Sequence, residues 1–159
     1  MFYICKIKNK HMKYEYKTKV LSFAEIDNLI ERLYTDGNYT MSLFIVLASA
    51  TSASAKDILR LKWKDIINKN GITIDITQSA EIVFTSYVKD YIINCYNSIS
   101  PNSTSTNIFL SRKHTCYSIQ RMNVMLKKLI VKYNLDLNTI STNTFRLIGK
   151  ANRREISHI

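Results

Sequence analysis

The sequence is poor in glycine and proline, the residues typical of turns and loops, with only 3 glycines and 1 proline among 159 residues. Folds built from many short strands need these residues at their turns, so their scarcity disfavours a sandwich or barrel and favours helices. Long apolar runs are missing too, because the longest, over residues 41–50, is too short to span a bilayer. No apolar core typical of a signal peptide stands near the amino terminus. We therefore expect a soluble, cytoplasmic protein.

Motifs for cofactors and for common catalytic sites are also missing. The three cysteines, Cys5, Cys95 and Cys116, are too widely spaced for a C-x-x-C metal site. Their odd number and separation suit reduced thiols in the cytosol. The sequence contains no glycine-rich phosphate loop, no Ser-His-Asp set and no catalytic carboxylate pair. We expect no metal ion, no cofactor and no small-molecule substrate.

Positive charge, in contrast, is abundant. The chain has 23 lysines and arginines against 12 acidic residues, which gives a formal net charge of +11. Such an excess attracts polyanions over long distances, so nucleic acid is the first candidate partner. An anionic membrane surface is the second candidate, and a basic protein without any polyanion partner is the plain alternative. The length corresponds to about one domain.

The spacing of apolar residues predicts a mainly helical chain with a small sheet. Helices are expected from Ser22 to about Asp36, from about Tyr39 to Ala50, shortly after Ser54, from about Ser86 to Tyr96, from Ser118, and from Ser141 or Thr142. Alternating apolar and polar residues predict an antiparallel strand pair over residues 71–77 and 81–85, and a short strand over residues 107–110. The predicted fold class is mainly α with a small antiparallel β-sheet (α+β), and the lysine-rich residues 1–20 are expected to form a basic arm.

Two segments carry a pattern more specific than helical spacing. Residues 51–66 read TSASAKDILRLKWKDI, and residues 140–146 read ISTNTFR. Together they resemble the two arginine boxes of the tyrosine recombinases (phage integrases), T-G-L-R-x-S-E-L-x-x-L-x-W-x-D-I and H-x-x-R. A strand and turn over residues 108–113, leading into the helix at Ser118, adds to this resemblance. It implies a recombinase catalytic-domain-like fold over residues 21–159, truncated at its carboxyl terminus, in a bacterial or phage-encoded protein.

The resemblance also implies a site that has lost most of its catalytic groups. The family cleaves DNA with a tyrosine and stabilises the charge on phosphorus with arginines, whose planar fork can bind two oxygens at once. This sequence has Ser54 at the first-box arginine and Asn143 at the second-box histidine, and it keeps only Arg146. The turn at residues 78–81 lacks the family's lysine, and no tyrosine follows Tyr133. We expect no intact catalytic set, which argues against an enzyme.

By the same resemblance, DNA contacts are expected from the boxes and from the basic turn and helix between them. The candidate residues are Arg146, Arg112, Lys113, His114, Gln120, Arg121, Lys56 and Arg60. Plainer interpretations stand beside these. Ser54 has the sequence context of a helix N-cap, Tyr133 can pack in the core, and basic helix faces are often only solvated.

Three functions fit these observations. The first is a DNA-binding protein derived from a tyrosine recombinase or integrase and inactive in strand cleavage. Its partner would be double-stranded DNA, with a full-length recombinase or a second copy of the chain as further candidates, and no membrane. The second is an active site-specific recombinase whose site is rearranged or completed in trans. The third is a structural or protein-interaction module of a phage or mobile element, since a fold does not fix a function.

Overall fold

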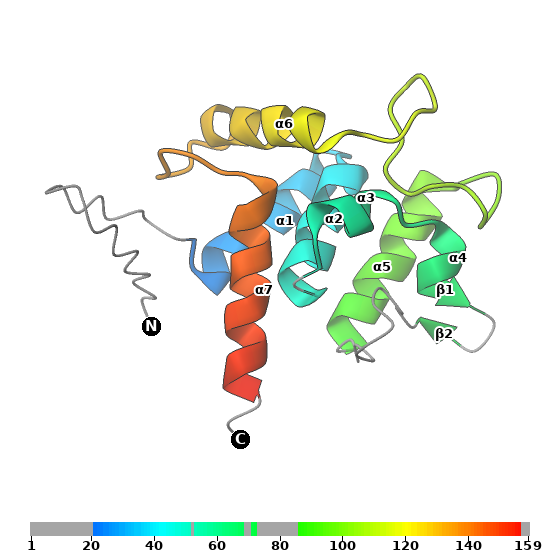
Figure 1. Cartoon of the computed structure of the whole chain (residues 1–159), viewed down its shortest axis with the longest axis horizontal. Coiled ribbons are helices and arrows are strands. Elements are labelled where there is room, and N and C mark those ends of the chain that lie inside the picture. The colour runs from blue at the N-terminus through cyan, green and yellow to red at the C-terminus, as the bar shows by residue number, and fades with distance from the viewer. Residues whose placement is uncertain (1–20, 52, 69–70, 73–85, 157–159) are drawn as a thin grey trace, which may run out of the picture.

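The computed structural model describes residues 21–51, 53–68, 71–72 and 86–156, and this part of the chain is mainly helical (Figure 1). Its helices are α1 (Phe23–Thr35), α2 (Tyr39–Thr51), α3 (Ala55–Leu59), α4 (Trp63–Ile66), α5 (Ser86–Ile99), α6 (Ile119–Lys132) and α7 (Thr142–Ile156). None of the helices in these ranges is long and apolar enough to cross a membrane. The expected basic arm, residues 1–20, lies outside the described residues.

Local sequence signals explain where the helices begin. The hydroxyl of Ser22 accepts the backbone N–H of Glu25 at 3.2 Å, and the Glu25 carboxylate accepts the backbone N–H of Ser22 at 2.7 Å. This is the capping box predicted for the start of α1, and it satisfies two N–H groups that a helix start leaves without partners. α5 runs to Ile99, past its expected end at Tyr96.

The described strands are shorter than expected and pair differently. β1 (Ile67–Asn68) pairs antiparallel with β2 (Gly71–Ile72), so the start of the expected strand over residues 71–77 finds its partner on its amino-terminal side. Residues 73–85 lie outside the described residues, and the expected pairing with residues 81–85 stays a prediction.

The prediction of a short strand over residues 107–110 is wrong. Asn107 forms one isolated bridge with Lys62, and Leu110 forms another with Cys116. The chain here passes between two different neighbours, so neither provides a continuous ladder of hydrogen bonds. The buried Ile108 and Phe109 between the two bridges are nevertheless core residues.

Helix α2 is the centre of the core. Residues 41–48 are all buried, so this helix has no solvent-facing stripe. α1, α3, α5 and α7 pack against it, and Figure 1 shows α7 and α5 on opposite sides of it. Phe44 on α2 meets Phe109 edge-on, with ring centroids 5.8 Å apart.

A buried polar chain links three helices. Ser42 on α2 donates a hydrogen bond to the carbonyl of Ile30 on α1 at 3.2 Å, and its hydroxyl is also hydrogen-bonded to that of Tyr91 on α5.

Burial raises the pKa of Tyr91 and raises the pKa of Cys95 to about 12. Both groups therefore stay neutral at physiological pH, and Cys95 is a structural thiol rather than a reactive one.

We expect Phe44→Ala to destabilise the protein by about 3–5 kcal/mol, because it removes a fully buried ring and leaves a cavity beside Phe109. Urea unfolding followed by the fluorescence of Trp63, the single tryptophan, measures this change. Phe23→Ala is the matched control. That ring is 42% exposed, and its loss should change the free energy of unfolding by less than about 1 kcal/mol. Equal effects of the two substitutions would contradict the packing described above.

Candidate nucleic-acid interface

The two recombinase-like boxes fold into neighbouring elements. Ser54 precedes α3, while Asn143 and Arg146 lie in the first turns of α7. α3 packs against both α7 and α6. At the start of α7, the backbone N–H of Thr142 donates to the side-chain oxygen of Asn123 on α6 at 2.9 Å. The structure therefore brings the elements of both boxes together beside α6.

Ser54 is the N-cap of α3, as its sequence context predicted. Its hydroxyl accepts the backbone N–H of Asp57 at 3.2 Å and donates to the Asp57 carboxylate at 2.6 Å. Both roles of the hydroxyl are thus taken by the helix start. Asn143 is exposed on α7, and Arg146 is half-buried.

A basic hairpin precedes α6. We use this name for residues 110–116, which are closed by the bridge between Leu110 and Cys116. The backbone N–H of Ser111 donates to the Thr115 carbonyl at 2.8 Å, and their hydroxyls are hydrogen-bonded at 2.9 Å. His114 has a φ of +58°, which closes the tight turn. Such values are uncommon outside glycine but accessible to histidine.

The tip of the basic hairpin presents cations to solvent. Arg112, Lys113 and His114 are all exposed. The hairpin and the start of α6 line one open depression, formed by Ser111, Arg112, Lys113, Thr115, Cys116, Tyr117, Ser118 and Arg121. Of the residues predicted to contact DNA, the structure therefore places Arg112, Lys113 and Arg121 around a single hollow.

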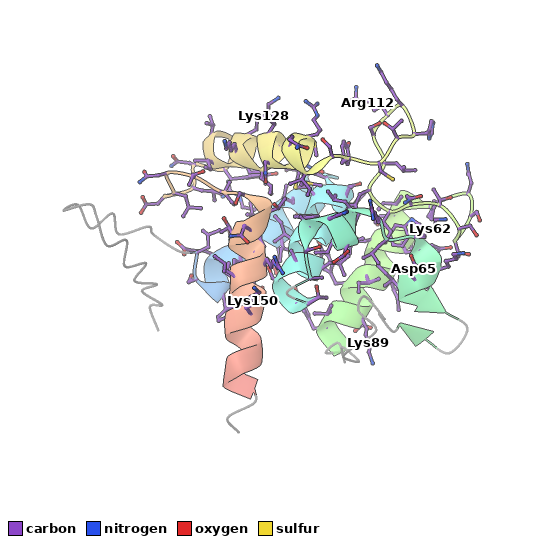
Figure 2. The ribbon with its side chains drawn as sticks, in the orientation of Figure 1. Lys62, Asp65, Lys89, Arg112, Lys128 and Lys150 are labelled. Carbon is purple, nitrogen blue, oxygen red and sulfur yellow. The ribbon has the colours of Figure 1, made fainter. Side chains whose placement is uncertain are left out.

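The outer face of α6 continues this basic surface. The hydroxyl of Ser118 caps the helix by accepting the Arg121 backbone N–H at 3.1 Å. Beyond the cap, Gln120, Arg121, Lys127 and Lys128 are exposed. Figure 2 shows Arg112 and Lys128 along the same edge of the molecule, whereas Lys89 lies at the opposite edge.

No acidic residue occurs between Asp90 and Asp136, a stretch that holds six lysines and arginines. The basic hairpin and α6 both fall inside it, so no carboxylate from the same stretch of chain neutralises them. Lys127 and Lys128 were not among the predicted site residues. The acid-free stretch is the sequence signal that would have pointed to them.

The carboxyl-terminal end of α6 is different, because it is tied to α1 by an ion pair. Lys132 lies 3.0 Å from the Asp36 carboxylate, and the Tyr133 hydroxyl donates to the same carboxylate at 2.6 Å. Arg32 donates to the Tyr133 carbonyl at 3.3 Å, and its guanidinium lies 4.7 Å from the centre of the Tyr133 ring. We call these four residues the α1–α6 clamp.

The α1–α6 clamp shifts the titration of its own members. The hydrogen bonds from Tyr133 and Lys132 lower the pKa of Asp36. The hydrogen bond to Asp36 raises the pKa of Lys132, and burial raises the pKa of Tyr133. Tyr133 is therefore a neutral, buried hydrogen-bond donor, in agreement with the core role expected for it.

The remaining predicted residues lie on α3 and at its end, where Arg60 is the C-cap. Lys56 and Arg60 are exposed there, and the carbonyl of Arg60 accepts a hydrogen bond from the Asn107 side chain at 3.3 Å. These two cations belong to the first box, and α3 packs against α6 and against α7, which carries the second box.

These elements together form a recombinase-like fold. Among solved structures, the chain is similar to the crystal structure of XerA recombinase, with a TM-score of 0.66 and 15% sequence identity. The match covers 94% of this chain and 52% of that chain, so this chain spans about half the length of the solved protein. At this sequence identity, the similarity is evidence for the fold alone. No protein family and no curated protein matches the sequence.

Ser54→Ala is expected to lower the free energy of unfolding by about 0.5–2 kcal/mol, because it removes the N-cap of α3. Urea unfolding measures the loss. Ser105→Ala, at an exposed loop serine, is the control and should have little effect. A Ser54→Ala protein as stable as the parent would contradict the capping role.

Asp36→Asn is expected to destabilise the protein near neutral pH and to lose this effect in acid. Because the pKa of Asp36 is lowered below its ordinary value of 3.8, the carboxylate stabilises the folded state above that value. This contribution disappears as the pH falls through the lowered pKa. Denaturant midpoints of the parent and Asp36→Asn should therefore differ at about pH 7 and converge at a pH well below 3.8.

Asp90→Asn, at an exposed carboxylate on α5, is the control for the general effect of removing one negative charge. A difference between the parent and Asp36→Asn that is the same at both pH values would refute the ionised clamp.

Proposed function

We propose that this chain binds duplex DNA through the basic hairpin and the first half of α6, and that it does not itself cleave the DNA. The proposal combines the recombinase-like fold with the distribution of charge on it. Since the structural likeness extends over about half of XerA recombinase, it supports the scaffold, and the site argument depends on this chain's own residues.

The observation that carries the proposal is the set of exposed cations on the basic hairpin and α6, in a stretch of chain that has no acidic residue. Arg112, Lys113, Arg121, Lys127 and Lys128 are all exposed within a stretch that has no carboxylate. Phosphates are evenly spaced along a duplex, and cations that meet them release condensed counterions, which favours binding. The capped start of α6 adds the positive end of a 14-residue helix, about 21 Å long.

The other predicted DNA contacts extend this surface in the proposal. Lys56 lies on α3 and Arg60 at its end, Arg146 lies on α7, and His114 lies at the tip of the basic hairpin. Their elements meet at or beside α6, so a duplex lying across the start of α6 would be within reach of long side chains from α3.

The absence of cleavage follows from two substitutions in the boxes. Ser54 is occupied as a helix cap and offers no cation where the family has an arginine. Removing one preorganised donor from such a site typically lowers the rate by about 100- to 1000-fold. Asn143 can donate a hydrogen bond but cannot exchange a proton near neutral pH, as a histidine would. A DNA-binding surface without its reaction is the simplest function for this combination.

Binding to a labelled random-sequence duplex, measured by fluorescence anisotropy, tests the proposal. If all five cations contact phosphates, the logarithm of the affinity should fall with the logarithm of salt concentration with a slope of about −4 to −5. Lys128→Ala should weaken binding and reduce the magnitude of this slope by about 1. Lys89→Ala, which removes the same charge from the opposite edge (Figure 2), should change neither quantity.

A nicked duplex incubated with the protein should yield no covalent protein–DNA adduct on a denaturing gel. An adduct would overturn the non-cleaving half of the proposal. Failure to bind the duplex at low salt, or an equal loss from the Lys89 and Lys128 substitutions, would overturn the binding half.

A further inference from the structure

Two valines stand out on the otherwise polar outer face of α6. Val124 is 45% exposed and Val131 is 85% exposed. A single exposed apolar residue needs no explanation. Val124, however, sits among the cations of the proposed interface, where an apolar group is the less expected choice.

The geometry of an α-helix places cations on both sides of Val124. With about 100° of rotation per residue, Lys127 lies about 60° to one side of it and Arg121 about 60° to the other. Lys128 lies about 40° from it on the Arg121 side, and Gln120 about 40° from it on the Lys127 side. Val124 thus occupies the middle of a face whose two margins are positive.

This arrangement matches the cross-section of a DNA major groove. A helix in that groove meets base edges along its middle and the two phosphate backbones along its margins. An apolar side chain on the middle line suits the methyl group of thymine, and glutamine suits the donor and acceptor of adenine. Lysines and arginines on both margins suit the phosphates.

We propose that Val124 contacts a thymine methyl group in the major groove and that Gln120 contacts an adjacent adenine, so that the chain prefers sites containing A·T pairs. The inference depends on the proposed DNA binding and adds the readout of bases to it. Residues four apart on a helix are about 6 Å apart along its axis, which corresponds to about two base pairs. The preferred thymine and the preferred adenine should therefore lie within about two base pairs of each other.

Val131 lies on the same face as Val124 but outside this readout. It is two turns farther along α6, next to Lys132 and Tyr133 of the α1–α6 clamp. The carboxylate of Asp36 pairs with Lys132 there, and Glu31 and Asp36 help to line the hollow around Tyr133. Arg32 and Lys132 balance these two carboxylates, so this end of α6 offers a duplex no net positive charge, and the duplex should engage the other half of the helix.

Selection from a random duplex pool, followed by sequencing of the bound fraction, tests the proposal. The parent protein should enrich a site with a thymine and an adenine at neighbouring positions. Gln120→Ala should relax the adenine preference by roughly fivefold or more. Val124→Ala should relax the thymine preference, whereas Val131→Ala, the matched control, should leave both preferences unchanged.

Replacing the selected thymine with deoxyuridine removes only the methyl group. For the parent protein and for Val131→Ala, this should weaken binding by about fourfold, the effect expected for one buried methyl-sized group. For Val124→Ala the replacement should have little effect, because the contact is already lost. The substitutions of valine by alanine should not disrupt α6, because alanine is the better helix former. Trp63 fluorescence checks that each variant stays folded.

The outcomes separate the two proposals. Salt-dependent binding with no sequence enrichment, or a uracil effect that is equal in the parent and in Val124→Ala, would overturn the readout by Val124 while leaving DNA binding intact. No binding of any duplex would refute both. Equal changes in base preference from Val124→Ala and Val131→Ala would refute the assignment of the readout to the first half of α6.

Discussion

The burial of α2 on all sides is the constraint on which the rest of the structure depends. A helix without a polar face is stable only when other helices cover every side of it. α1, α3, α5 and α7 provide that cover, and their positions around α2 follow from it. The two box-bearing elements, α3 and α7, are thus neighbours because both must cover the same helix. This core packing brings α7, which carries Arg146, into contact with α3, which Ser54 caps.

Much of the helical framework could be predicted because its signals are local. The capping box at Ser22 and the N-cap at Ser54 each involve residues three apart, and the apolar spacing of α6 marks its buried face. Such signals can be identified in the sequence without knowing what lies across the core. The resemblance of the boxes added the expectation of a recombinase-like fold, and the structural likeness supports it.

The parts that could not be predicted depend on distant residues. The α1–α6 clamp joins Asp36 to Tyr133, which are 97 residues apart. The sequence near either residue contains no signal that identifies the other as its partner. Similarly, residues 107–110 read as a strand because Ile108 and Phe109 are apolar. Their burial is real, but the neighbouring segments on the two sides do not extend a ladder. Val124 could be identified as a candidate base contact only after the structure showed which face of α6 is exposed.

The net charge of +11 is a weaker argument for DNA binding than the way the charge is distributed. Glu25, Asp27 and Glu31 lie on α1 and Asp36 at its end, so a third of the 12 acidic residues lie along one helix. The clamp brings one of these carboxylates to the far end of α6, where it pairs with Lys132. The start of α6 and the basic hairpin keep their cations without such a partner in the same stretch of chain. One helix therefore carries a neutralised end and a positive end, and in the proposed complex this difference in potential would orient the duplex before any base is contacted.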